Sequence, residues 1–239
     1  MLTDLWDRAS ATQPPLSWEL SLALGLLALA IVATPAGWRI VRHLVTLIHE
    51  AGHAAMAILV GRQVGGIRLH SDSSGVTLSR GRPRGPGMIA TVLAGYPAPA
   101  VVGLAGAWLL GAGHAAAVLW ALVFTCALMV VAIRNWYGLW VVLVTGTGVA
   151  LLSWFAPGQV LTGVAYLLVW VLLLTAPRSL VNLQSARRSR GSRTSDPDQL
   201  ARLTWLPAWL WVGVFWVLCL AALAVGAWQL VPVSLGQGS

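Results

Sequence analysis

The sequence predicts an all-α membrane protein that crosses the bilayer several times. Three observations carry this prediction: 58% of the 239 residues are hydrophobic, only 9% are charged, and the charge-free stretches are long. A soluble domain has about a quarter of its residues charged, and a helix needs about 20 apolar residues to cross about 30 Å of hydrocarbon. The chain is therefore expected to lie in a lipid bilayer as a single domain over residues 1–239.

The expected spans follow one another as apolar stretches. The runs without a charged residue are 20–38, 85–133, 135–177 and 203–239. The second and third runs are long enough for two helices each, with natural breaks at 111–114 and 156–159. Residues 43–61 add one more span. The total is about seven (six to seven) transmembrane helices.

Three less apolar segments lie outside these spans. Residues 1–17 are expected to form an N-terminal tail that is not cleaved as a leader. Residues 62–86 partly alternate polar and apolar residues around a turn at 72–75, which predicts a short membrane-associated β-hairpin in an inside loop. Residues 177–203 are expected to form a second inside loop, rich in Arg and Ser.

The distribution of arginine predicts the orientation. All 15 basic residues are Arg, and the net charge is +8. With the N-terminus inside and seven spans, only Arg39 and Arg42 fall outside, in agreement with the positive-inside rule. The positive charge then reflects orientation and contact with anionic lipid, and no nucleic-acid partner is expected. We expect a multi-pass protein of a bacterial plasma membrane, with the N-terminus and the active-site side cytoplasmic.

The stretch HLVTLIHEAGHAAMAILVG places a Glu between two His residues inside an otherwise apolar span. On a helix, His49 and His53 are four residues apart, so both rings lie on one face, about 6 Å apart along the axis, and can share one Zn²⁺ ion. Glu50 lies beside this metal without binding it, where it can accept a proton from a water that zinc makes acidic. This pattern indicates hydrolytic chemistry.

Histidines that only pack between helices are the alternative interpretation. An ionised carboxylate in a span costs about 2.5 to 3.5 kcal/mol, which argues against Glu50 as a mere packing residue. His53 precedes Arg62 by nine residues, so it is expected roughly 13 Å below the inside boundary of the membrane. The reaction would then occur within the bilayer.

These residues resemble the site-2 protease family of intramembrane zinc metallopeptidases, in its bacterial polytopic branch. The resemblance rests on LIHEAGHAAMAILVG, VGGIRLHSDSSGVTLSR (64–80), LAGYPAP (93–99) and an Asp close to a later span. It implies zinc ligation by His49 and His53, with Glu50 as general base. It also implies a β structure after the metal helix, to which an unfolded substrate segment adds as a strand, with Gly66 and Ile67 as substrate-binding residues.

Two departures from the family pattern leave parts of the site open. There is no Asp-Gly pair to supply the third ligand, and AGYPAP lacks the Asn that often accompanies this motif. Asn135 is the expected polar partner of the substrate backbone, with a helix cap as its alternative role.

Elimination leaves His70, Asp72, Asp196 and Asp198 as candidates for the third ligand. Asp196 is favoured, because it precedes the last span as in the branch of the family that has a Ser-Asp ligand motif. Asp198, the hairpin residues and a site completed by water alone remain alternatives. Asp196 would also serve as an N-cap before Pro197, and both roles are compatible.

We therefore expect a zinc endopeptidase that cleaves transmembrane segments of partner membrane proteins. The alternative is a zinc-binding membrane protein without proteolytic activity: a transporter, a sensor or an inactive scaffold. A transporter should show polar residues on several spans, whereas the ionisable residues inside the spans are nearly confined to 49–53. This favours the enzyme and leaves the oligomeric state open.

Overall fold

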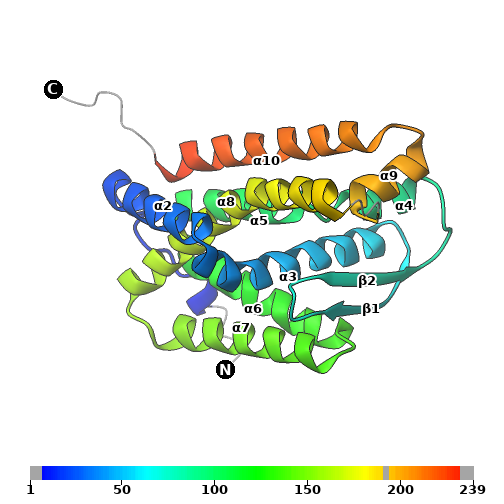
Figure 1. The fold of residues 1–239 in the computed structure, drawn as a ribbon. Helices are drawn as coiled ribbons and strands as arrows, with labels where there is room; N and C mark the ends of the chain where they lie inside the picture. The colour runs from blue at the N-terminus through cyan, green and yellow to red at the C-terminus, as the bar shows by residue number, and fades with distance from the viewer. Residues whose placement is uncertain (1–6, 191–193, 232–239) are drawn as a thin grey trace.

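The computed structural model of the chain describes residues 7–190 and 194–231, which form a bundle of helices with one β-hairpin at its side (Figure 1). In chain order the elements are α2 (Trp18–Ala33), α3 (Pro35–Leu59), β1 (Gln63–Leu69), β2 (Gly75–Arg80), α4 (Pro86–Leu93), α5 (Ala98–Gly111), α6 (Ala115–Ala132), α7 (Trp136–Phe155), α8 (Gly158–Arg190), α9 (Asp196–Thr204) and α10 (Ala208–Leu230). Part of the expected Arg-rich loop, residues 191–193, lies outside the described residues, as do 1–6 and 232–239.

Four helices among the described residues, α6, α7, α8 and α10, are long and apolar enough to cross a membrane. Two further pairs of helices meet this criterion only jointly, and both are bent: α2 and α3 meet at 97°, and α4 and α5 meet at 68°. The count is thus four, or up to six when each bent pair is one span. The chain is a mostly helical, multi-pass protein, and the expected count of seven is not confirmed.

The bend between α2 and α3 has a local cause. Thr34 ends α2 in an extended conformation, and its hydroxyl accepts a hydrogen bond from the Gly37 N–H at the start of α3. Pro35 occupies the first position of α3, where its missing N–H costs nothing. A helix therefore ends and a new one begins inside the run that was expected to form a single span.

The expected hairpin is present as two antiparallel strands, with an irregularity between Val64 and Gly66. Gly66 has a φ of 148°, and a Cβ there would overlap the Arg134 side chain.

The second expected loop, residues 177–203, differs from the structure, because α8 continues through Pro177 to Arg190 and α9 begins at Asp196. Most of residues 177–203 are therefore helical, in line with the helix-forming residues of this stretch.

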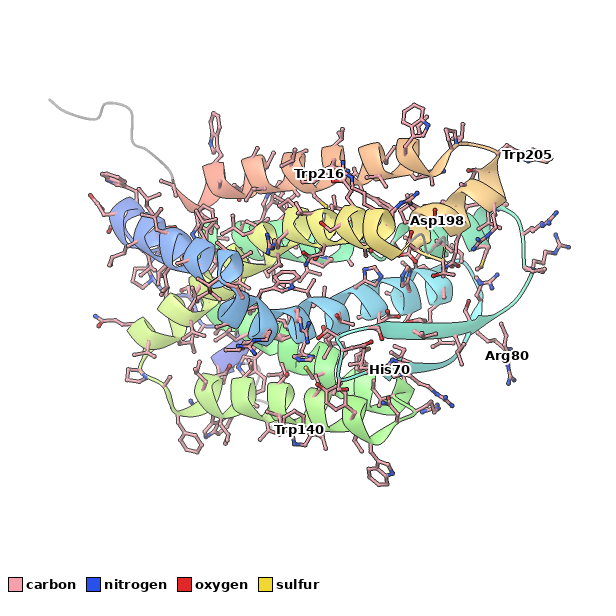
Figure 2. All side chains as sticks on the ribbon, viewed as in Figure 1. His70, Arg80, Trp140, Asp198, Trp205 and Trp216 are labelled. Carbon is pink, nitrogen blue, oxygen red and sulfur yellow. The ribbon has the colours of Figure 1, made fainter. Side chains whose placement is uncertain are left out.

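Helices α5 to α8 and α10 run between two ends of the bundle (Figure 1). We call the end with the hairpin, α4 and α9 the site end, and the end with residues 112–114 and 156–157 the far end. Figure 2 shows Arg80, Asp198 and Trp205 at the site end. Helix α8 lies in the middle of the bundle, where Leu173 packs against Gly103 of α5 and Gly226 of α10.

The segment before α2 lies at the far end. An Arg8 Nη1 donates to the Trp154 carbonyl over 3.1 Å, and its guanidinium lies 4.3 Å from the Trp154 ring centroid. The Gln13 N–H donates to the Gly113 carbonyl over 2.8 Å. These residues therefore lie at the end opposite the site, and the expectation that the N-terminal tail shares a membrane side with the site is not confirmed.

Candidate metal centre

Helix α3 brings the two histidines of the motif together. The spacing of four residues places their rings on one helix face, with centroids 4.7 Å apart and planes at 87°. The two Nε2 atoms lie 3.1 Å apart. Glu50 lies between them in sequence and is 3% exposed.

Helix α4 fixes the orientation of the His53 ring. The Nδ1–H of His53 donates to the Thr91 carbonyl over 2.7 Å. Thr91 lies in the last turn of α4, where carbonyls have no partner within the helix. Because Nδ1 carries the proton, the lone pair is on Nε2, as metal ligation requires.

The break between α4 and α5 leaves room for both imidazoles. Gly95 lies in this break, and a Cβ at this position would overlap Nε2 and Cε1 of His53 and approach His49 Cε1 to 2.7 Å. The next residue, Tyr96, packs its ring edge-on against His49 at 4.9 Å and stacks on Phe215 of α10 at 5.4 Å. The LAGYPAP motif therefore forms a wall of the site.

Asp196, at the start of α9, completes a triangle of possible ligand atoms. Its Oδ2 lies 3.3 Å from His49 Nε2 and 3.2 Å from His53 Nε2. Zinc bonds of about 2.0 to 2.1 Å in a tetrahedron place neighbouring ligand atoms about 3.3 Å apart. Asp196 Oδ2 is buried and has no hydrogen bond of normal geometry. The three residues therefore fit a zinc ion with a fourth position left over.

Asp196 was expected to serve both as a zinc ligand and as the N-cap of a helix, and the start of α9 shows that another residue takes the second role. Ser195 is the N-cap, and Asp196 is the first residue of the helix. The Ser195 N–H donates to Asp198 Oδ2 over 3.2 Å, so Asp198 takes part in the capping. The interpretation of Asp196 as the N-cap is therefore wrong, and its carboxylate is free to face the histidines.

The other candidates for the third ligand lie elsewhere. Asp198 Oδ1 is 3.0 Å from Arg187 Nη2 of α8. Asp72 is exposed in the hairpin turn, where its Oδ1 accepts hydrogen bonds from the N–H and the hydroxyl of Ser74. These bonds hold the pKa of the Asp72 carboxyl below its usual value. His70 is also exposed, and its Nδ1 lies 3.3 Å from Ser74 Oγ. Within residues 7–190 and 194–231, the group of three that could hold a metal is His49, His53 and Asp196.

A cavity of about 450 Å³ opens beside these residues. It is lined by the three possible ligands, Glu50 and parts of β2, α4 and α9, including Gly75, Thr77, Ser79 and Gln199. The Thr77 hydroxyl donates to Glu50 Oε2 over 2.6 Å. Thr77, Gly75, Thr91 and Gly95 were not identified from the sequence, because their roles depend on contacts between distant segments.

The structure does not bring Gly66, Ile67 and Asn135 to this cavity. Asn135 binds the backbone of Leu69 twice, accepting from its N–H over 3.2 Å and donating to its carbonyl over 2.7 Å. The Arg134 N–H donates to the Ile67 carbonyl over 2.9 Å. Residues 133–135 therefore close the outer edge of β1, on the side away from β2.

Comparison with known protein families supports this geometry. A family model described as peptidase M50B-like matches residues 22–226, which include α3, the hairpin and α9. The searches of curated proteins and of solved structures found no match.

Proposed function

Because the chain belongs to the peptidase M50B-like family, we propose that it is a zinc-dependent intramembrane endopeptidase. Its substrates would be membrane proteins that it cleaves in or near a transmembrane segment. One observation carries the proposal: His49 Nε2, His53 Nε2 and Asp196 Oδ2 converge beside the buried carboxylate of Glu50 in one cavity.

The residues divide the work between ligation and proton transfer. His49, His53 and Asp196 would hold the ion, which when bound supplies a Lewis acid that acidifies water and polarises the scissile carbonyl. Glu50 is not one of the three possible ligands and would act as general base, accepting a proton from the attacking water and passing it to the leaving amine. The Thr91 carbonyl holds the His53 ring in the required tautomer.

The edge of β2 away from β1 pairs with no strand in the described part of the chain, and this free edge is suited to hold an extended substrate. Ile67 and Leu69 direct their backbone groups to residues 133–135, so their partners Thr77 and Gly75 form pairs without hydrogen bonds between the strands. The backbone groups of Thr77 and Gly75 then point away from β1, and both residues line the cavity. A substrate segment that unwinds could add to this edge as a strand, which exposes its peptide bonds to hydrolysis. The sequence analysis expected the substrate to contact Gly66 and Ile67 of β1. We propose instead that it contacts β2.

A zinc-binding protein without proteolytic activity is the competing function. A transporter, sensor or scaffold has no need of a buried carboxylate next to the ligand triangle, where Glu50 is 3% exposed. We therefore prefer the enzyme. As part of the same proposal, the site end faces the cytoplasm of a bacterial cell, because the hairpin, its flanking residues and the end of α8 carry most of the arginines.

The Glu50→Gln variant tests the proposal most directly. The three possible ligands remain while the proton acceptor is lost, so we expect normal zinc content and a loss of cleavage of about 100- to 10,000-fold. Zinc is measured by metal analysis of the purified protein, and cleavage with single-span membrane proteins in detergent or liposomes. His49→Ala and His53→Ala are the comparison variants and should lose zinc. Cleavage at the wild-type rate by Glu50→Gln would refute the enzyme.

A further inference from the structure

We propose that Thr77 is a positioning residue for Glu50, and that the absence of a side chain at Gly75 provides the space that the Glu50 carboxylate occupies. Both residues lie on β2, the strand that borders the cavity. The inference rests on the proposed function for the role of Glu50 as a base. The contact itself is a property of the chain without metal.

The hydrogen bond from Thr77 meets a need of the buried carboxylate. Glu50 is 3% exposed, and a buried charge is costly unless it is hydrogen-bonded. Its Oε2 accepts a bond of 2.6 Å from the Thr77 hydroxyl, which lies 3.2 Å from the Glu50 carbonyl as well. Across the described part of the chain, this hydroxyl is the side-chain donor that the structure gives to the Glu50 carboxylate.

Gly75 constrains the same carboxylate from the other side. A Cβ at Gly75 would lie 2.5 Å from Glu50 Oε1, 2.6 Å from Cγ and 2.7 Å from Cδ. Gly75 is not among the residues with a positive φ, so its backbone conformation does not require glycine. What requires glycine here is the space taken by Glu50. The strand therefore fixes one oxygen by a hydrogen bond and leaves room for the other.

Thr77 also connects the base to the substrate. Its side chain binds Glu50, while its backbone groups face the cavity on the free edge of β2. A substrate strand that pairs with this edge would lie next to the residue that orients the base. The position of the base relative to the scissile bond is then set by one strand, and a displacement of about 1 Å is enough to slow a reaction about 100-fold.

The first test observes the contact without using activity. The chain contains two Glu residues, Glu19 and Glu50, so labelling the Glu side-chain carboxyl carbon with ¹³C gives two NMR signals. The Glu50→Gln variant assigns them. In the metal-free protein, Thr77→Val should move the Glu50 signal and leave the Glu19 signal in place, because valine keeps the shape of threonine but lacks the hydroxyl.

The second test measures kinetics. Thr77→Val should lower kcat about 10- to 100-fold, with KM within about twofold, because the base is misplaced while the substrate edge remains. Thr77→Ser keeps the hydroxyl, so its kcat and the position of its Glu50 NMR signal should be close to those of the wild type. Gly75→Ala should lower kcat at least as much as Thr77→Val, with zinc content retained.

Thr125→Val is the matched control, because within residues 7–190 and 194–231 the Thr125 hydroxyl donates to the Ala121 carbonyl of its own helix α6 and is remote from Glu50 in sequence. It should leave kcat, KM and both signals unchanged. If Thr77→Val leaves the Glu50 signal and kcat as in the wild type while Glu50→Gln abolishes cleavage, the positioning role is refuted and the proposed function stands. If Glu50→Gln cleaves normally, the proposed function fails instead, and a moved NMR signal would still establish the contact.

Discussion

The first turn of α9 carries two aspartates, Asp196 and Asp198, that are close in sequence and both largely buried but are bound in different ways (Figure 2 labels Asp198). Asp198 has a partner for each oxygen: Oδ1 faces Arg187, and Oδ2 accepts hydrogen bonds from the N–H and the hydroxyl of Ser195. Asp196 Oδ2 faces only the two imidazole nitrogens and has no hydrogen bond of normal geometry.

The difference shows that burial and charge alone do not mark a metal ligand. A buried carboxylate whose oxygens are all satisfied stabilises the fold, whereas one whose lone pair is unused can bind a cation. Asp198 connects α9 to α8 through Arg187 and caps the helix through Ser195. Asp196 lies in the same turn and faces the two histidines. The comparison predicts opposite consequences for equivalent substitutions at the two positions.

The largest effect is expected for Asp196→Asn. Asn keeps the shape of the side chain but is a neutral and poor zinc ligand, so zinc affinity should fall by more than about 100-fold and cleavage should be lost. Metal analysis after dialysis against a competing chelator measures the first effect, and the cleavage assay the second. The metal-free variant should be no less stable than the metal-free wild type. Normal zinc content in this variant, together with zinc loss in Asp72→Asn, would move the ligand to the hairpin.

A smaller effect of a different kind is expected for Asp198→Asn. The substitution leaves the Arg187 guanidinium, whose side chain is 26% exposed, without its anion. We expect the metal-free protein to lose about 2 kcal/mol of stability, or about 4 to 8 °C in Tm, as measured by thermal unfolding in detergent. Zinc affinity should fall less than in Asp196→Asn. Equal losses of zinc in both variants, with unchanged Tm, would remove the distinction between the two aspartates.

The smallest effect is expected for Arg187→Lys. Lysine keeps the charge opposite Asp198 but not the planar fork of donors, so we expect a loss of about 1 kcal/mol or less. The same thermal unfolding measurement detects it, with Arg188→Lys as the comparison on the exposed neighbour. A loss larger than that of Asp198→Asn would show that Arg187 stabilises the fold through contacts other than Asp198.

Parts of the site that depend on local spacing were predictable from the sequence. His49, Glu50 and His53 follow from the helical period within one span, and the hairpin follows from its alternation and turn. Asp196 came from elimination and from a family resemblance, and its unused oxygen becomes visible only when α9 is placed against α3. Thr77 and Gly75 act through contacts 27 and 25 residues away from Glu50 on another element, which no local pattern encodes.

The prediction of the membrane spans relied on apolar composition and overlooked a local helix-start signal. The run 20–38 contains Thr34 and Pro35, a helix-start signature that would have shown the break between α2 and α3. With this break, α2 and α3 count as one bent pair, so the expected count of seven is not confirmed, and Arg8 lies at the far end. Asn135 was expected to bind the backbone of the substrate, whereas in the structure its side chain binds the backbone of Leu69 in its own chain.

Gly95 gives a criterion for interpreting how chains of this kind diverge. A Cβ at this position would lie within 2.7 Å of atoms of both imidazoles, so any side chain would displace the rings from the positions in which they face Asp196. A descendant that kept both histidines and the glutamate but replaced this glycine would retain the recognisable signature and lose the geometry. We expect such a sequence to be a pseudoenzyme, so the residue at this position should be inspected before the motif alone is taken as a sign of catalysis.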